Sequence, residues 1–354
     1  MNPIFQRWAA RLPLIRRIAN RQAVALHHIT AGFVYSQILQ ACVQLNLFDA
    51  LRDGALSTDQ IASRVGLSRD GLLTLLKGAA SLKLIDQLDT ELWGLGQLGT
   101  ATLAYPGIAA MVDHHKLLYH DLESPVKRLM TRESTALSAY WPYAEGTSNS
   151  AAAAKYSDLM AESLAIISTH ILDACRLQHA GTLMDVGGGS GAFAAAAIDR
   201  YPHLKVVVAD LPDVVASAAA TARATDNAQL SFTGVNVFNA PLPLGADVIS
   251  LVRILHDHDD DKALAIVKAA RQALNEGGQL IIAEPMAGTR GGEAIGHGYF
   301  GLYLWAMGSG RPRTASEISQ LLRAGGFSEV TEHRSNMPVL VRVISGTVNT
   351  VKNY

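Results

Sequence analysis

The chain has 354 residues, of which 49% are hydrophobic and 17% are charged, and its net charge is −1. This apolar content excludes a disordered chain, and the balanced charge argues against a dedicated nucleic-acid-binding protein. Two cysteines cannot build a disulfide framework, and no apolar stretch is long enough to span a membrane. We therefore expect a cytoplasmic protein, membrane-peripheral at most. Its length predicts two domains, or one large domain with an appendage.

The first 30 residues form a basic arm in which hydrophobic residues are interleaved with arginines. No acidic residue precedes Asp49, and the arginines occur at Arg7, Arg11, Arg16, Arg17 and Arg21. The pattern predicts one or two short amphipathic helices, interrupted at Pro13. Such an arm suits either an anionic membrane surface or a partner subunit, and we favour the partner subunit.

Residues 31–110 have the pattern of a winged helix-turn-helix. Helices are expected over 36–51, after a cap at Ser57 or Thr58, and over 69–82, with a β-hairpin over 86–99. A DNA-reading helix at 69–82 would carry several basic residues, but only Arg69 and Lys77 are available. We therefore predict that this module serves packing and dimerisation rather than DNA binding.

After this module, the pattern changes from helices to alternating strands and helices. Residues 111–178 look mainly helical around a loop at 140–150, and we assign them to a linker and substrate lid. Short β-rich runs then recur at 182–186, 205–209, 229–233, 248–252, 279–283 and 339–344. The alternation predicts a catalytic domain over 179–354, built on a parallel, doubly wound sheet.

A glycine-rich loop joins the first of these strands to a helix, in Asp185-Val186-Gly187-Gly188-Gly189-Ser190-Gly191. As G-x-G-x-x-A the loop would be the dinucleotide fingerprint of a dehydrogenase, which is one alternative. A carboxylate at Asp185 would repel a pyrophosphate, whereas it suits a cationic ligand such as S-adenosylmethionine. Asp210 ends the next strand, where an acid accepts ribose hydroxyls in either class. We expect Asp185, Gly187, Gly189 and Asp210 to bind the cofactor.

A second glycine pair sharpens the choice of cofactor. Gly277-Gly278 predicts a helix stop immediately before the strand at 279–283. With the glycine loop and the second acid in the same order, the chain resembles the class I methyltransferases. This resemblance implies S-adenosylmethionine as the cofactor.

Histidines and acids cluster after the strand at 248–252, in His256-Asp257-His258-Asp259-Asp260-Asp261. Binuclear metallohydrolases begin their ligand set with H-x-H-x-D, but they need a further histidine where Asp261 stands, so we expect no metal. Asp259 or Asp260 can cap the next helix. That role leaves His256 unexplained at the strand's carboxyl end, the edge where open α/β sheets bind ligands.

The segment Ile254-Leu255-His256-Asp257 resembles the I-L-H-D-W segment of the small-molecule O-methyltransferases, and the similarity extends over about residues 35–345. Members of that family join a winged-helix dimerisation domain to a Rossmann-like catalytic domain. The resemblance therefore implies the same α/β fold, a homodimer, and a histidine general base at His256. An acid on the following strand, matched by Glu284, would support the base.

Three departures from the family pattern affect individual contacts. Pro312 stands where the family has a second supporting acid, so only one acid partner carries over. Asn236 replaces the acid that contacts adenine in the family, and Val252 replaces a lysine of the plant members, with Arg253 beside it. We keep Asn236 and Arg253 as cofactor-binding residues.

The acceptor is expected to be a hydrophobic small molecule. Tyr156 and Met160 match residues that reach over the ligands in the family, and helix packing is their alternative role. Tyr299, Tyr303 and Met307 lie in an apolar stretch where the family places its substrate-lining helix. The basic arm, the His-Asp cluster and residues 307–313 most resemble the bacterial carotenoid enzymes, which methylate a tertiary hydroxyl of acyclic carotenoids such as hydroxyneurosporene and demethylspheroidene.

Two other functions stay open at this point. One is a methyltransferase of the same architecture that acts on a phenol, a polyketide or a tetrapyrrole. The other is a winged-helix regulator that binds the cofactor without catalysis.

Overall fold

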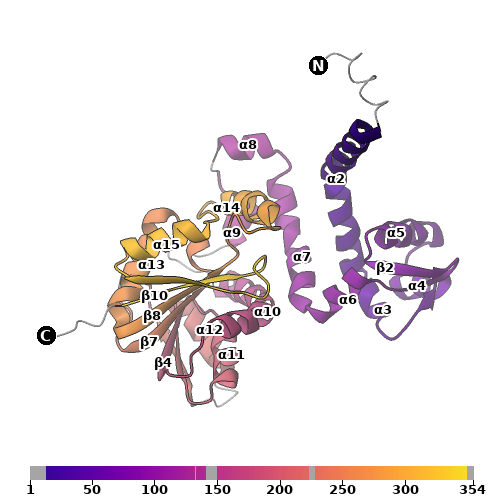
Figure 1. The fold of residues 1–354 in the computed structure, drawn as a ribbon. Coiled ribbons are helices and arrows are strands. Elements are labelled where there is room, and N and C mark those ends of the chain that lie inside the picture. The colour runs from indigo at the N-terminus through magenta and orange to yellow at the C-terminus, as the bar shows by residue number, and fades with distance from the viewer. Residues whose placement is uncertain (1–12, 132, 141–149, 223–227, 349–354) are drawn as a thin grey trace. The chain divides into compact units, whose positions relative to one another are not determined.

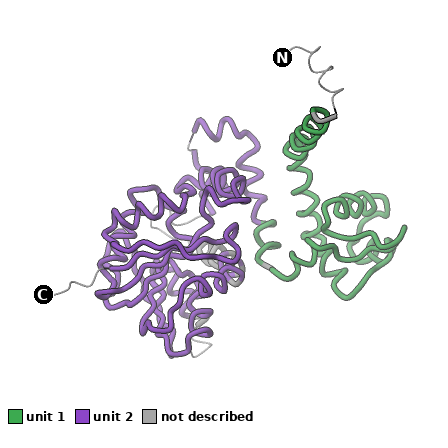
Figure 2. The backbone as a smooth tube through the Cα atoms, in the orientation of Figure 1, with its two compact units in different colours: residues 1–113 green, residues 114–354 purple. Residues whose placement is uncertain are grey.

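The computed structural model describes residues 13–131, 133–140, 150–222 and 228–348. The chain divides into two compact units, residues 1–113 and 114–354, which Figure 2 colours separately. The boundary lies within helix α7 (Pro106–Asp121), so the segment expected as a linker and lid belongs to the second unit from residue 114 onward. Within the described parts of the chain, none of the helices combines the length and apolar content that crossing a bilayer requires.

Unit 1 combines helices with a small antiparallel sheet of order β1-β3-β2, as expected for a winged helix. Ser57 caps helix α4 by accepting from the Gln60 backbone N–H, while the Gln60 side chain accepts from the Ser57 N–H. Trp93 is fully buried at the centre of this unit. The elements are α2 (Pro13–Gln44), α3 (Leu47–Ala50), β1 (Leu56–Ser57), α4 (Thr58–Val65), α5 (Arg69–Ser81), β2 (Ile85–Asp89), β3 (Leu92–Leu95) and α6 (Gln97–Ala104).

The first described helix differs from the prediction. A separate helix from Ser36 was expected, but α2 runs without interruption from Pro13 to Gln44. The expected interruption at Pro13 falls at the edge of the described residues and stays a prediction. Proline is tolerated in the first turn of a helix because its missing N–H has no partner there. Pro13 therefore stands at the beginning of the described helix. The part of the arm before residue 13, with Arg7 and Arg11, lies outside the described residues.

Unit 2 is an α/β domain in which helices cover both faces of a central sheet (Figure 1). Its helices are the last part of α7, then α8 (Pro125–Met130), α9 (Ala136–Tyr140), α10 (Ser150–Ala174), α11 (Ala192–Arg200), α12 (Pro212–Ala222), α13 (Asp260–Ala273), α14 (Phe300–Met307) and α15 (Ala315–Ala324). A one-turn 3-10 helix, η2 (Leu255–Asp257), follows β7, and a π-helical turn, η3 (Ala294–Tyr299), precedes α14. The strands are β4 (Thr182–Val186), β5 (Lys205–Asp210), β6 (Leu230–Gly234), β7 (Ala246–Val252), β8 (Leu274–Glu284), β9 (Glu329–His333) and β10 (Arg342–Thr347).

The described strands form a seven-stranded sheet of order β6-β5-β4-β7-β8-β10-β9. The first five strands are parallel, but β10 pairs antiparallel with both β8 and β9, so the expectation of an all-parallel sheet is wrong at this edge. Only residues 334–341 join β9 to β10, and a parallel crossover needs a dozen residues or more. The short connection therefore forces the antiparallel pair. Strand β9 was not anticipated from the sequence.

The helix stop predicted at Gly277-Gly278 is also displaced. Helix α13 ends at Ala273, and β8 begins at Leu274 and continues through both glycines. Gly277 has a φ of +72°, and a Cβ on Gly278 would lie 2.9 Å from the Asn275 carbonyl oxygen. The two glycines therefore allow the irregular backbone in the first part of β8, and they do not end helix α13.

The two faces of the sheet pack into separate hydrophobic cores. Alternate residues of each strand point to opposite faces, so Met184 and Val186 join one core and Leu183 joins the other. One core includes side chains of α13 and α15, and the other includes side chains of α10 and α11. This three-layer arrangement brings the carboxyl ends of β4, β5, β6 and β7 to one edge, where the functional residues lie.

Candidate active site

The glycine loop after β4 approaches the neighbouring loops too closely for side chains. Gly187, Gly189 and Gly191 all have positive φ, which disfavours L residues. A Cβ on Gly187 would lie 2.3 Å from Cδ1 of Ile254, and one on Gly188 would lie 2.4 Å from Oδ2 of Asp185. The loop is therefore a backbone cradle between β4 and α11.

Asp185 lies beneath this cradle rather than in the open cavity beside it. Its side chain is fully buried, Oδ1 accepts from the Ser250 hydroxyl at 2.6 Å, and Oδ2 has no partner among the described residues. Burial and the nearby Asp210 raise the pKa of Asp185 to about 7, although the Ser250 hydroxyl opposes the shift. The Asp185 carboxylate, which was predicted to bind the cofactor, therefore lies behind the residues that line the cavity. One of its two oxygens has no hydrogen-bond partner among the described residues.

Asp210 ends β5 and lines the cavity. Its Oδ2 accepts from the Gly189 N–H at 2.8 Å and its Oδ1 from the Leu211 N–H at 2.7 Å. Burial raises its pKa, and these two bonds oppose the shift. Because each carboxylate oxygen has two lone pairs, one acceptor site remains on each oxygen, which suits the two hydroxyls of a ribose.

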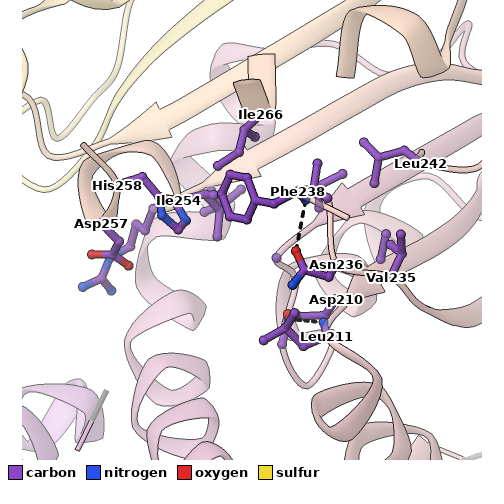
Figure 3. A pocket seen from close by; sticks show the side chains of 18 of the residues that line it. Asp210, Leu211, Val235, Asn236, Phe238, Leu242, Ile254, Asp257, His258 and Ile266 are labelled. Atoms are coloured by element: carbon purple, nitrogen blue, oxygen red, sulfur yellow. Dashed lines mark hydrogen bonds between the residues drawn. The ribbon is translucent and has the colours of Figure 1, made fainter. Parts of the chain in front are cut away.

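The loop after β6 forms another wall of the cavity (Figure 3). Asn236 Oδ1 accepts from the Phe238 N–H at 3.0 Å, so its amide N–H groups are the part left for a ligand. The Lys262 ammonium lies 5.7 Å from the centre of the Phe238 ring, and the His258 ring meets that ring edge-on. Burial lowers the pKa of His258 to about 4, which keeps its ring neutral.

These loops enclose a cavity of about 340 Å³, within the range of small-molecule sites. Among the predicted site residues, the ones that line it are Met160, Gly187, Gly189, Asp210, Asn236 and Arg253. Arg253 has a φ of +59°, and its guanidinium donates to the Ser163 hydroxyl of α10 at 2.7 Å. Tyr156 belongs to α10, but its side chain lies outside the described residues.

His256 is buried in η2, directly after the carboxyl end of β7. Its Nε2 lies 3.1 Å from Oδ1 of Asp257, and its Nδ1 has no partner among the described residues. Glu284, at the end of β8, accepts from the backbone N–H of His256 at 3.0 Å. The acid expected to orient the ring therefore holds the main chain instead, and Asp257 is the carboxylate that contacts the ring.

The electrostatic environment of His256 favours its charged form. Burial lowers the pKa of the ring, but the carboxylates of Asp257 and Glu284 outweigh burial and raise that pKa above its ordinary value. Burial also raises the pKa of Glu284, and the adjacent His256 opposes that shift. A ring next to two acids is well placed to take up a proton and to be stabilised as imidazolium.

Of the residues predicted to bind the acceptor, Met160 lines the cavity from α10, whereas Tyr299, Tyr303 and Met307 lie on η3 and α14, outside the cavity lining. The Tyr299 hydroxyl lies 2.8 Å from Nε2 of His115, and the Tyr303 hydroxyl lies 2.9 Å from Nε2 of His114. Met307 is fully buried in a cluster with Tyr303 and Leu137. The Phe300 ring, on the same helix, lies 6.0 Å from the His256 ring, so this helix faces the proposed base.

The cavity fits the cofactor that the resemblance implies. A glycine cradle suits a ligand that touches backbone, Asp210 suits a ribose, and the ionised form of Asp185, whose Oδ2 has no partner among the described residues, would favour a cationic group nearby. Among the described residues, no group of three or more His, Cys, Asp and Glu side chains is arranged to hold a metal ion.

The sequence did not single out several residues of this site. Phe238, His258 and Lys262 line the cavity, and Asp257 contacts the histidine ring. Asp257 and His258 belong to the polar cluster at 256–261, and Lys262 follows that cluster directly. Their position after β7 is the sequence signal that could have identified them as site residues. Phe238 carries no comparable signal, because an aromatic residue in a loop is more often part of a core.

Family comparisons agree with this architecture. Residues 119–328 match the sequence model of the O-methyltransferase domain, and residues 27–104 match that of the O-methyltransferase dimerisation domain. The first range falls wholly within unit 2 and the second wholly within unit 1.

Individual proteins are similar along nearly the whole chain. Demethylspheroidene O-methyltransferase of Cereibacter sphaeroides is 40% identical over 331 residues, which cover 92% of this chain and 87% of that protein. Acetylserotonin O-methyltransferase of Mus musculus is 28% identical, covering 89% and 86%. The fold matches human N-acetylserotonin methyltransferase in complex with SAM, with a TM-score of 0.79 and 23% identity over 93% of this chain and 98% of that chain. The chain therefore belongs to the family of S-adenosylmethionine-dependent O-methyltransferases.

Proposed function

We propose that this enzyme methylates a hydroxyl of an acyclic carotenoid, such as hydroxyneurosporene or demethylspheroidene, with His256 as the general base. The observation that carries the choice of acceptor is the 40% identity to the demethylspheroidene enzyme of Cereibacter sphaeroides over most of both chains. The relative from Mus musculus, whose name gives acetylserotonin as its acceptor, is more distant at 28%.

The helix that faces His256 supports an apolar acceptor. Residues 300–307 are Phe-Gly-Leu-Tyr-Leu-Trp-Ala-Met, without a charged side chain. The hydroxyls of Tyr299 and Tyr303 each have a histidine partner. Their polar groups are therefore satisfied within the protein, so the surface left for an acceptor is mainly aromatic and aliphatic.

The contacts of the His256 ring favour Nδ1 as the basic atom. If Nε2 carries its proton toward Asp257, the lone pair of the neutral ring is on Nδ1, which has no partner among the described residues. Nδ1 then accepts the hydroxyl proton of the acceptor. Asp257 stabilises the resulting imidazolium, and Glu284 holds the backbone of the same residue.

When bound, S-adenosylmethionine supplies an electrophilic methyl group on a sulfonium. A tertiary alcohol is a much weaker acid than a phenol, so His256 cannot form a free alkoxide beforehand. We therefore propose that Nδ1 removes the proton as the new O–C bond forms and the C–S bond breaks. The products are a methyl ether and S-adenosylhomocysteine, and much of the rate enhancement comes from holding the reacting atoms in line.

The acceptor is tested by offering the purified enzyme labelled S-adenosylmethionine with three acceptors. These are a hydroxylated acyclic carotenoid in detergent, the same carotenoid lacking the hydroxyl, and N-acetylserotonin as a phenol. We expect label only in the methyl ether of the hydroxylated carotenoid, identified by mass. Preferential labelling of the phenol would show that the proposed acceptor is wrong.

The base is tested with His256→Ala. We expect kcat to fall by about 100- to 10,000-fold, the usual contribution of general base catalysis, with an unchanged affinity for S-adenosylhomocysteine. His179→Ala, which changes an exposed histidine in the turn between α10 and β4, is the matched control and should keep full activity. Wild-type turnover in His256→Ala would exclude His256 as the base.

A further inference from the structure

We propose that Arg313 is a positioning residue that fixes the catalytic loop carrying His256. This inference rests on the proposed role of His256 and adds a residue that neither the cavity lining nor the sequence motif identified. Arg313 lies between α14 and α15, more than fifty residues after the loop that it contacts.

The Arg313 guanidinium is almost fully buried, with 1% of its side chain exposed, and its partners are all on the loop and helix that follow β7. Nη1 donates to the Leu255 carbonyl at 2.6 Å, and Nη2 donates to the His258 carbonyl at 2.7 Å. Nε and Nη2 both donate to Oδ1 of Asp260, at 3.1 and 2.8 Å. One planar group thus holds both ends of the turn that contains His256 and Asp257.

The residues just before Arg313 hold the middle of the same turn. The Arg311 backbone N–H donates to the His256 carbonyl at 2.9 Å, and the Ser309 hydroxyl donates to the Asp257 carbonyl at 2.8 Å. Gly310 has a φ of +81°, and a Cβ there would lie 2.0 Å from the His256 carbonyl oxygen. Residues 309–313 therefore form a strap against the loop, and we use this name for them below.

The strap explains how the loop is fixed although Pro312 stands where the family has a supporting acid. Carbonyls of consecutive loop residues accept from the strap, while Glu284 accepts the one N–H of His256. The backbone of His256 is thereby held from both sides. A shift of this backbone would move the ring relative to the acceptor hydroxyl, and small misplacements of a catalytic group have large effects on turnover.

Arg313→Lys tests the proposal while keeping the buried charge. A lysine ammonium is a point donor and cannot reach two carbonyls and a carboxylate with the geometry of a planar fork. We expect kcat to fall by about 10- to 100-fold, with KM for the acceptor and Kd for S-adenosylhomocysteine changed by less than about threefold.

Arg200→Lys is the matched control, because Arg200 also pairs with an aspartate but lies at the end of α11, outside the strap. Its side chain is 54% exposed and its guanidinium donates to Asp173 at 3.0 Å. We expect its kcat to stay within about twofold of the wild type. Equal losses in the two variants would contradict a specific role for Arg313.

A double-mutant cycle separates positioning from general stability. If Arg313 acts through His256, Arg313→Lys should lower the residual kcat of His256→Ala by less than about twofold. Two results would overturn the proposal about Arg313. One is a double variant in which the fold-losses of kcat from the two substitutions multiply, and the other is a normal kcat in Arg313→Lys while His256→Ala is inactive. Full activity of His256→Ala would instead overturn the proposed base, so the two failures are distinguishable.

If Arg313→Lys does not fold, Asp260→Ala provides a milder change. It removes the carboxylate that anchors the guanidinium and leaves both loop carbonyls and the arginine in place. We expect a smaller loss of kcat in the same direction, together with normal binding of S-adenosylhomocysteine. A wild-type kcat in this variant would contradict the proposal.

Discussion

At the scale of single residues, the protonation of His256 depends on its two acidic neighbours. Asp257 contacts the ring, and Glu284 contacts the backbone, yet both raise the pKa of the ring against the effect of burial. A general base must be neutral before it can accept a proton. Turnover should therefore decline as the pH falls through the pKa of His256, and this decline should begin at a higher pH than for an ordinary histidine.

We predict that Asp257→Asn moves the acidic limb of the kcat profile to lower pH. The change removes the charge that contributes most to raising the pKa of His256, while the asparagine oxygen can still accept from Nε2. The measurement is kcat as a function of pH for the variant and the wild type.

Asp261→Asn is the control for this experiment, because it removes an exposed acid from the first turn of α13 without touching the ring. Its acidic limb should coincide with that of the wild type. A limb in Asp257→Asn that stays in place, or moves to higher pH, would show that Asp257 does not set the pKa of the base.

At the scale of elements, a buried carboxylate joins the end of α7 to the start of α9. Asp121 is the last residue of α7, and its two oxygens accept from the backbone N–H groups of Ala136 and Leu137, at 2.9 and 2.8 Å. The N–H groups of a helix's first turn lack helical partners, and a carboxylate there also complements the helix dipole. The Thr135 hydroxyl then donates to the Ala306 carbonyl of α14 at 2.7 Å. Asp121 thereby helps to fix α9 against the helix that faces His256.

Asp121→Ala should lower the free energy of unfolding by about 2 to 4 kcal/mol, because two backbone donors at a buried site lose a charged acceptor. Denaturant unfolding followed by circular dichroism measures the change. Glu123→Ala, two residues later and exposed, should differ from the wild type by less than about 0.5 kcal/mol. Similar stabilities for the two variants would contradict the role of Asp121 in joining these helices.

At the scale of the whole molecule, helix α2 presents hydrophobic side chains that unit 1 leaves uncovered. More than half of each side chain is exposed at Ile18, Val24, Leu26, Ile29 and Phe33. Exposed apolar groups at helical spacing are typical of an interface, and residues 27–104 match the dimerisation domain. The sequence favoured a partner subunit over a membrane for this arm, and that choice stays a prediction.

We predict that the full chain is a dimer, with a mass about twice 37.8 kDa by sedimentation equilibrium or light scattering. Introducing charge with Ile29→Glu and Phe33→Glu together should shift the mass toward that of one chain, because both side chains would be desolvated in the interface. A wild-type chain that is monomeric at every concentration, or a double variant with an unchanged mass, would contradict this assignment.

Much of the fold could be predicted from local sequence. Strand β4 has the predicted bounds, and β5, β6 and β7 agree within two residues, because buried strands between helices leave a clear apolar pattern. The edge strand β9 is mostly exposed and leaves no such pattern, so it was missed.

The sequence by itself determined the kind of site: a glycine loop, an acid one strand later and a histidine after β7 are local signals, since each depends on residues close together in the chain. Tertiary structure alone decided how these parts are held. It put Asp185 beneath the cradle, gave the ring contact expected of Glu284 to Asp257, and brought Arg313 to the loop that carries His256. Contacts of this kind join residues far apart in sequence, and they depend on packing and burial that no local pattern records.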